Sequence, residues 1–523
     1  MSTTAVSVAA PPSESSASAK SRLPRWLLPL CCLSALTLLA FLLLGYHPYV
    51  EDAGIYVAGI KLELHPDLYS TGSEFVTAQM RLSLFAYWFA ALVRLTHLPL
   101  SVLLLATQLL SLLLLLFSIR ELALLCFSEA RAQWAAVTLI AVALATPVAG
   151  SSIFLYDPYV TGRSFSTPFI LLAVCACLKR QPLAVLLALF VAGCFHPLMA
   201  IYAAGFILVL WAVQSGRIGL GLALCGGAVL ASGALQFSQR NAVETSAYLN
   251  AALSRTYFYL SQWHWYELIG LAGPLLIFAL LIYAGLYQPD MHLRRPVATC
   301  AITSLLIGVT AIAINLLFAR ASVQPHLIAR LQVMRNFHIP YFLLFMLLGG
   351  LMGRYWLRRS VLRWALTFAA LSAIVIVAQR QTWPDSNYYE LPGLPPHNQW
   401  VQAFEWVKAY TPQHDLVALD ANYITADRED AHNFRTIAER DTLADYSKDG
   451  GAAAIFPELA PRWMSEHTAT TGLSSMSDAQ RIQQLSPLSV TWVILQQKDQ
   501  TGAARTAFAC PYRNATVLVC RLP

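Results

Sequence analysis

Charged residues are scarce in this chain. Only 12% of its 523 residues are Asp, Glu, Lys or Arg, whereas 57% are hydrophobic, and the mean hydropathy is +0.54. Soluble globular domains usually carry about 25% charged residues. The low charge therefore excludes a chain built only of soluble domains and is typical of a protein embedded in a bilayer.

The net charge of +7 is unevenly spread along the chain. Residues 380–523 hold 12 Lys/Arg and 16 Asp/Glu, whereas the rest of the chain holds 23 Lys/Arg and only 12 Asp/Glu. Basic residues between apolar segments usually mark cytoplasmic loops. We therefore expect membrane lipids, and no nucleic acid, among the partners of this protein.

The ten cysteines lack the spacing of a metal site. Cys510 and Cys520 are the only two in the polar C-terminal part. They can form a disulfide if that part faces an oxidising compartment, but the sequence does not decide this.

The apolar segments predict an α-helical polytopic membrane protein. A Ser/Ala/Pro-rich tail, residues 1–25, precedes the first segment, and no clear small-residue cleavage site follows, so we interpret the segment as an uncleaved span. The tail is expected to be disordered and cytoplasmic. About eleven spans are expected, with ten, twelve or thirteen left open: 26–46, 99–119, 132–150, 164–178, 182–196, 197–214, 218–237, 265–287, 296–318, 336–353 and 361–379.

With the N-terminus inside, eleven spans leave nearly every tight basic cluster in the cytoplasm, as the positive-inside rule requires. Segment 81–97, with Tyr87, Trp88 and two arginines, is then an interfacial helix rather than a span. The predicted divisions are a membrane domain, 26–379, with a first outer loop at 47–98; a Pro-rich linker, 380–400; and a small extracytoplasmic α/β domain, 401–523. We expect the protein in the cell (inner) membrane.

The expected outer face gathers the polar residues that are candidates for function. Glu51 and Asp52 follow the first span directly, where ionised groups are costly unless they are solvated or used. The outer segment 319–336 holds arginines without any acidic residue, and guanidinium groups suit lipid phosphate. The remaining candidates, taken as substrate contacts, lie in other outer loops or turns: Tyr56, Asp157, His196 and His264.

Each candidate also has a plainer interpretation. Glu51 and Asp52 fit an acidic loop or a helix N-terminus, and Asp157 fits a turn before Pro158. His196 fits a satisfied interfacial histidine, and His264, between two tryptophans, fits a membrane-interface belt. The arginines at 320, 330 and 335 can equally pair with acidic residues elsewhere or face water.

The chain contains, in order, the first span, the motif Glu51-Asp52-x-x-x-Tyr56, the aromatic segment Arg81 to Phe89, and the Leu-rich span that ends at Ser118-Ile119-Arg120. This layout resembles the GT-C class of membrane glycosyltransferases. Many members have Asp-Glu or Asp-Asp followed by a double proline; this chain has Glu-Asp and no double proline. The later segments 157–164, 195–199, 434–440 and 448–449 also resemble a less-characterised bacterial family related to this class.

The resemblance implies an inverting transfer of a hexose or pentose from a polyprenyl-phosphate donor to an acceptor on the outer face. Asp52 matches the second acid of the pair and is the first candidate for the general base, with Glu51 second. Four arginines are candidates for binding the donor phosphate: Arg163, Arg320, Arg330 and Arg335.

Some members of the class bind a divalent metal through such carboxylates, so the resemblance suggests Mg²⁺ or Mn²⁺, although no ligand spacing decides it. Two other functions stay open. One is a non-catalytic membrane protein that binds a partner or a lipid-linked saccharide. The other is a lipid-saccharide transporter, against which the nearly uncharged span centres argue.

Overall fold

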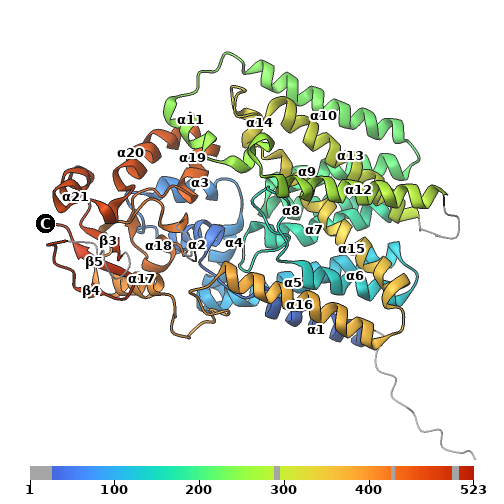
Figure 1. Ribbon diagram of the computed structural model, residues 1–523, viewed down its shortest axis with the longest axis horizontal. Helices are drawn as coiled ribbons and strands as arrows, with labels where there is room; N and C mark the ends of the chain where they lie inside the picture. Colours follow the sequence, from blue (N-terminus) through green and yellow to red (C-terminus); the bar gives the residue numbers. More distant parts are fainter. Residues whose placement is uncertain (1–25, 288–294, 426–429, 431, 498–505) are drawn as a thin grey trace, which may run out of the picture.

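The computed structural model describes residues 26–287, 295–425, 430, 432–497 and 506–523. The predicted N-terminal tail, residues 1–25, lies outside these residues. Figure 1 shows the membrane-length helices at one end of the molecule and a small sheet at the other, with the N-terminal helices α2 (Glu51–Leu64) and α3 (Ser73–Met80) between them. The predicted fold class, a polytopic α-helical membrane protein with a C-terminal α/β part, is confirmed.

All eleven expected spans contain helices. Eight helical segments in the described residues are long and apolar enough to cross a membrane. They are α1 (Leu27–Leu44), α5 (Leu100–Cys126), α9 (Pro197–Gln214), α10 (Ile218–Ser238), α12 (Trp265–Tyr287), α13 (Arg295–Phe318), the segment Leu327–Leu357 and α16 (Val361–Thr382). The segment Leu327–Leu357 includes α14 (Leu327–Arg330), η3 (Val333–Phe337), α15 (His338–Leu351) and η4 (Met352–Leu357).

Three expected spans form shorter apolar helices: α6 (Ala130–Ala143), α7 (Gly162–Leu178) and α8 (Pro182–Phe195). The expected span 132–150 is too long, because α6 stops before Thr146 and Pro147. A residue that precedes proline is disfavoured in helical conformation. Pro147 instead forms an isolated β-bridge with Phe154, so the chain turns back toward α7 here.

The expected interfacial segment 81–97 corresponds to α4 (Phe85–Thr96), which meets α3 at an angle of 95°. Trp88 of α4 packs edge-on against Phe165 and Phe195, with ring centroids 5.3 and 5.7 Å apart. By length and composition, this bent pair would count as a ninth span among the described residues. Its position along the membrane surface stays a prediction.

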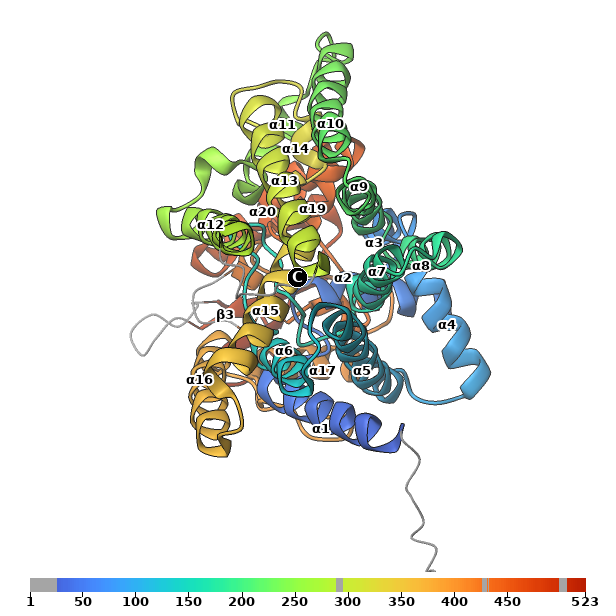
Figure 2. The same ribbon diagram turned by 90° about the vertical axis from the view of Figure 1, so that its right-hand side faces the viewer.

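The membrane helices form a bundle, and α5, α6, α7, α9, α13 and α15 each contribute several residues to its buried apolar core. Figure 2, turned by 90°, shows α1 and α16 at one edge of this bundle and α10 at the opposite edge. The same apolar core continues into the C-terminal part through Ala453, Ala460 and Trp463. The two parts are therefore packed together, and the predicted boundaries at 379 and 400 stay predictions.

The C-terminal part contains a five-stranded mixed sheet with strand order β2-β1-β3-β5-β4. Strands β1 and β2, and β1 and β3, are parallel, whereas β5 is antiparallel to both β3 and β4. The strands are β1 (Leu416–Ala418), β2 (Asp441–Thr442), β3 (Trp492–Gln496), β4 (Tyr512–Arg513) and β5 (Val517–Arg521).

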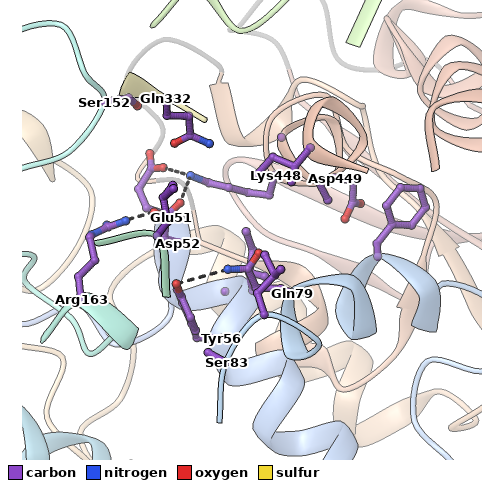
Figure 3. A pocket seen from close by; sticks show the side chains of 18 of the residues that line it. Glu51, Asp52, Tyr56, Gln79, Ser83, Ser152, Arg163, Gln332, Lys448 and Asp449 are labelled. Carbon is purple, nitrogen blue, oxygen red and sulfur yellow. Dashed lines mark hydrogen bonds and ion pairs between the residues drawn. The ribbon is translucent and has the colours of Figure 1, made fainter. Parts of the chain in front are cut away.

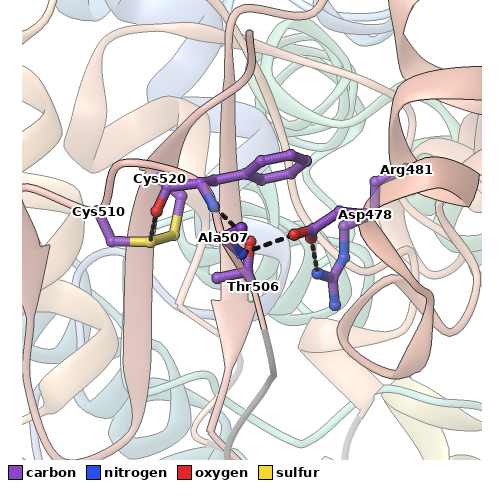
Figure 4. Close-up of a disulfide and its surroundings, with 7 residues drawn as sticks. Asp478, Arg481, Thr506, Ala507, Cys510 and Cys520 are labelled. Atoms are coloured by element: carbon purple, nitrogen blue, oxygen red, sulfur yellow. Dashed lines mark hydrogen bonds and ion pairs between the residues drawn. A yellow bond between two sulfur atoms is a disulfide. The ribbon is translucent and has the colours of Figure 1, made fainter.

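Helices surround this sheet, and a disulfide closes its edge. Cys510 and Cys520 are joined, as Figure 4 shows. The helices, apart from single 3-10 turns, are α17 (Gln399–Tyr410), α18 (Phe434–Ala438), α19 (Lys448–Ile455), α20 (Ala460–Thr470) and α21 (Asp478–Leu485); α11 (Ser246–Leu253) of the membrane part packs on α19 and α20.

Helix α2 also joins the two parts, because it packs directly on α18. A Cβ atom at Gly54 would lie 2.3 Å from Cβ of Asn433, so only glycine permits this approach. Farther along α2, Lys61 Nζ donates to Glu439 Oε1 and to the carbonyl oxygen of Thr436, both at 2.6 Å. The C-terminal part thus fixes the orientation of α2.

We expect Gly54→Ala to lower the melting temperature of the purified protein, because the added methyl group must push α2 away from α18. Overpacking of this kind costs about 1–3 kcal/mol. The matched control is Gly226→Ala in α10, where an added Cβ meets no heavy atom within 4 Å. Thermal unfolding in detergent measures both variants, and equal melting temperatures would contradict the close packing of α2.

Candidate functional site

The carboxylates of Glu51 and Asp52 lie in the first turn of α2, directly after the turn that follows α1. The free N–H groups and the dipole of a helix N-terminus favour negative charge there. Glu51 has a φ of 49°, in the left-handed region that non-glycine residues seldom adopt. Such backbone conformations cost about 1–3 kcal/mol and cluster at functional sites.

Cations from two distant segments contact this pair (Figure 3). Lys448, the first residue of α19, directs Nζ to Glu51 Oε2 and to Asp52 Oδ1, the latter at 3.1 Å. Arg163, in the first turn of α7, donates from Nη2 to Asp52 Oδ2 at 3.1 Å and to Asp157 Oδ2 at 2.9 Å. Positively and negatively charged side chains from three separate segments of the chain therefore alternate in the site.

These contacts decide the protonation of Asp52. Burial alone would raise its pKa, but Lys448, Arg163 and Arg335 hold the pKa of this carboxyl well below its usual value. At Asp157 the effect of burial is larger than that of the neighbouring Arg163, so the pKa of this carboxyl is raised. Asp52 is thus the carboxylate that is firmly ionised at neutral pH, and its basicity is correspondingly low.

The carboxylate pair opens on a cavity of about 550 Å³ between the membrane helices and the C-terminal part. The structure brings most of the predicted site residues to its wall: Glu51, Asp52, Tyr56, Arg163, His196, Arg330 and Arg335. Tyr56 accepts a hydrogen bond from Gln79 at 3.4 Å, and His196 caps α9 by accepting from the backbone N–H of Met199 at 3.4 Å. The cavity is large enough for a sugar headgroup.

The arginines of the cavity differ in how their charge is balanced. Arg163 has two carboxylate partners. Within the described residues, Arg330 and Arg335 make no salt bridge, and they face the rings of Tyr248 and Tyr257 at 5.8 and 6.0 Å. Nε of Arg335 is buried without a hydrogen-bond partner in the described part of the chain. A buried donor of this kind is costly unless a ligand satisfies it.

Three predicted residues lie outside the cavity wall. Arg320 is exposed, and its Nε donates to the carbonyl of Leu316 one turn back. His264 is exposed and stacks on Tyr266, with ring centroids 5.2 Å apart. Asp157 is buried, and its carboxylate accepts a hydrogen bond from Arg163, which lines the cavity.

No protein-family model and no curated protein sequence matches this chain. Its fold is similar to that of solved oligosaccharyltransferases. One is the oligosaccharyltransferase of Archaeoglobus fulgidus in complex with Zn and sulfate: 13% identity, a TM-score of 0.39, and coverage of 89% of this chain and 68% of that one. Another is archaeal oligosaccharyltransferase AglB from Archaeoglobus fulgidus in complex with an inhibitory peptide and a dolichol-phosphate: 13% identity, a TM-score of 0.42, and coverage of 90% and 70%.

These neighbours belong to the GT-C class that the sequence resembles. At 13% identity and TM-scores below 0.5, the likeness concerns the fold alone. The roles of residues in this chain therefore rest on its own geometry.

Sequence reasoning missed Lys448, although it singled out segment 448–449 as part of a resemblance. No pattern around this lysine indicates a site, because it reaches the carboxylates only through the packing of α19 on the membrane part. Hydrogen bonds to the backbone of Lys448 and of the two residues before it hold the lysine in place. Arg255 donates to the carbonyl oxygens of Tyr446 and Ser447 at 2.8 and 2.7 Å, and the N–H of Lys448 donates to Asp445 Oδ1 at 2.5 Å.

The residues at the carboxylates do not fit the divalent metal that the resemblance suggests. The described part of the chain has no group of three or more His, Cys, Asp or Glu side chains placed to hold a metal ion. Lys448 and Arg163 already occupy the oxygens of Asp52 that would coordinate one.

We expect the stability of the protein to fall between about pH 4 and pH 7 because of Asp445. Burial and the charge of Asp449 raise the pKa of Asp445 to about 7, whereas an unfolded aspartate titrates near ~3.9. In that interval the native state binds a proton that the unfolded state has lost, so rising pH favours unfolding.

Asp445→Asn removes this proton uptake. Its melting temperature in detergent should therefore exceed that of the wild type by a few degrees at pH 8 and approach it at pH 5. A difference that is the same at both pH values would contradict a raised pKa at Asp445.

Proposed function

We propose that this protein is an inverting membrane glycosyltransferase that moves a sugar from a polyprenyl-phosphate donor to an acceptor. One observation carries the proposal. A single cavity beside the membrane helices joins an ionised carboxylate, Asp52, to two arginines that lack a carboxylate partner in the described chain. A transfer from a lipid phosphate requires both a proton acceptor and a site for the departing anion.

Arg335 and Arg330 bind the donor phosphate in this proposal. Within the described residues neither guanidinium makes a salt bridge, and Nε of Arg335 has no hydrogen-bond partner there. Arg163 has a different role. Its charge is already balanced by Asp52 and Asp157, so it holds Asp52 in place rather than binding phosphate. A lipid-linked donor places its headgroup at the cavity while its tail stays in the bilayer.

Asp52 accepts the proton of the acceptor hydroxyl. Its low pKa keeps it ionised at neutral pH, as a proton acceptor must be, but makes it a weak base. Proton transfer therefore follows the attack of the hydroxyl oxygen on the anomeric carbon, since bonding to carbon makes the attached proton acidic. The bond between this carbon and the phosphate oxygen breaks at the opposite face, which inverts the configuration, and the arginines stabilise the departing phosphate.

The cavity and the C-terminal part lie on the extracytoplasmic side in this proposal, with the N-terminus in the cytoplasm. The Cys510–Cys520 disulfide agrees with this side, because structural disulfides persist in oxidising compartments. The membrane is the cell (inner) membrane of a bacterium, as the resemblance to the bacterial family suggests.

We expect Asp52→Asn to reduce sugar transfer by about 10²- to 10⁴-fold, the usual contribution of a general base. The assay incubates the purified protein with a panel of polyprenyl-phosphate sugars and acceptors and measures release of the lipid phosphate. Asp67→Asn, at an exposed acidic residue of the same outer loop, is the matched control and should keep full activity. Full activity in both Asp52→Asn and Glu51→Gln would exclude the proposed base and favour a non-catalytic binding protein.

We expect Arg335→Gln to weaken the binding of polyprenyl phosphate. A hydrogen bond to a charged group contributes about 1.5–3 kcal/mol, which corresponds to roughly a 10- to 150-fold change in affinity. Arg320→Gln is the control, because it removes an arginine near the same membrane edge that does not line the cavity. A titration of the detergent-solubilised protein with the lipid measures both, and equal losses would show a general charge effect instead of a phosphate site.

A further inference from the structure

Lys448 occupies an unusual place for a lysine. Its side chain is only 13% exposed, and its Nζ lies between the carboxylates of Glu51 and Asp52, contacting an oxygen of each. Two adjacent carboxylates repel each other unless a cation lies between them. Here that cation belongs to the chain itself and comes from a segment almost 400 residues away in sequence.

The position of the Lys448 ammonium group is also fixed by contacts that do not involve Glu51 or Asp52. Arg435 donates from Nη1 to both oxygens of Asp449, at 2.8 and 2.9 Å. Asp449 in turn accepts from the N–H of Asp445 at 3.0 Å. Together with the bonds from Arg255 to the preceding loop, this network anchors the start of α19 to the membrane part. The lysine is therefore preorganised.

The carboxylate oxygens that a second cation would need are already in contact with cations of the chain. Lys448 contacts Glu51 and Asp52, and Arg163 contacts Asp52 and Asp157. A magnesium ion binds oxygen at about 2.0–2.1 Å and requires near-octahedral coordination. To approach the oxygens of Glu51 and Asp52 this closely, it would have to displace Nζ of Lys448.

We propose that Lys448 takes the place of a divalent metal ion between Glu51 and Asp52 and makes this site metal-independent. Lys448 is a positioning residue: it holds the two carboxylates together and keeps Asp52 ionised toward the cavity. The proposal rests on the proposed function for its use in sugar transfer, but its cation-binding half can be tested without any sugar donor.

The first test titrates the full-length protein with Mn²⁺ and follows binding by electron paramagnetic resonance. The wild type should bind no more Mn²⁺ than the variant that carries Glu51→Gln and Asp52→Asn. Lys448→Met should gain a Mn²⁺ site, and this site should disappear in the triple variant with Glu51→Gln and Asp52→Asn. Lys408→Met is the matched control, because it also removes a lysine that is ion-paired to a glutamate, Glu439, but one that does not line the cavity.

Two outcomes overturn the proposal. One is stoichiometric Mn²⁺ binding to the wild type that is lost in Glu51→Gln, because the metal would then displace the lysine. The other is a folded Lys448→Met protein that gains no Mn²⁺ affinity. If Lys448→Met does not fold, the wild-type titration alone still decides between a metal site and a lysine site.

The second test measures transfer activity. Treatment with EDTA and re-addition of Mg²⁺ or Mn²⁺ should leave the wild-type rate unchanged. Lys448→Met should lose about 10- to 100-fold, the usual cost of removing a group that orients a functional side chain, and Lys448→Arg should recover most of it. A rate restored by metal in the EDTA-treated wild type overturns the proposal. If Asp52→Asn keeps the wild-type transfer rate, the proposed function is overturned instead. The result of the Mn²⁺ titration is independent of that outcome.

Discussion

The structure depends on two neighbouring carboxylates at the start of α2, of which Asp52 is largely enclosed, with 28% of its side chain exposed. Charged groups lose their hydration when they are partly buried, and this loss must be offset by opposite charges at short distance. Asp52 satisfies the requirement with Lys448 on one oxygen and Arg163 on the other. Because these cations come from α19 and α7, the requirement forces the C-terminal part, the first outer loop and a membrane helix to meet at one point.

This constraint explains several features that otherwise look unrelated. Gly54 lacks a side chain so that α2 can approach α18. Gly162 lacks one because a Cβ atom there would lie 2.5 Å from the carbonyl oxygen of Phe195, where α7 begins. Both glycines therefore permit close approaches that bring Asp52 and Arg163 together. The remaining arginines, Arg330 and Arg335, are left without carboxylate partners in the described residues, so the cavity keeps an electropositive wall.

The sequence predicted the features that depend on local composition. Apolar runs located every expected membrane helix, and the acidic pair after the first run marked the position of the cavity. The sequence was wrong about the end of the expected span 132–150, because α6 ends at Ala143, before Pro147. It also could not distinguish Arg335 from Arg320. Both lie in the same acid-free segment, and only the turn of the chain around η3 directs one of them to the cavity. The sequence did not identify Lys448 as a site residue, because only the folded chain brings it into contact with Glu51 and Asp52.

The separation between Asp52 and Lys448, 396 residues, has a consequence for biosynthesis. At about 5–20 residues per second, a ribosome needs roughly 20–80 s to reach the lysine after it has made the aspartate. During that interval the acidic pair lacks Lys448, and the part of the cavity wall that α19 supplies does not exist. The cavity is thus completed only when nearly the whole polypeptide has been made.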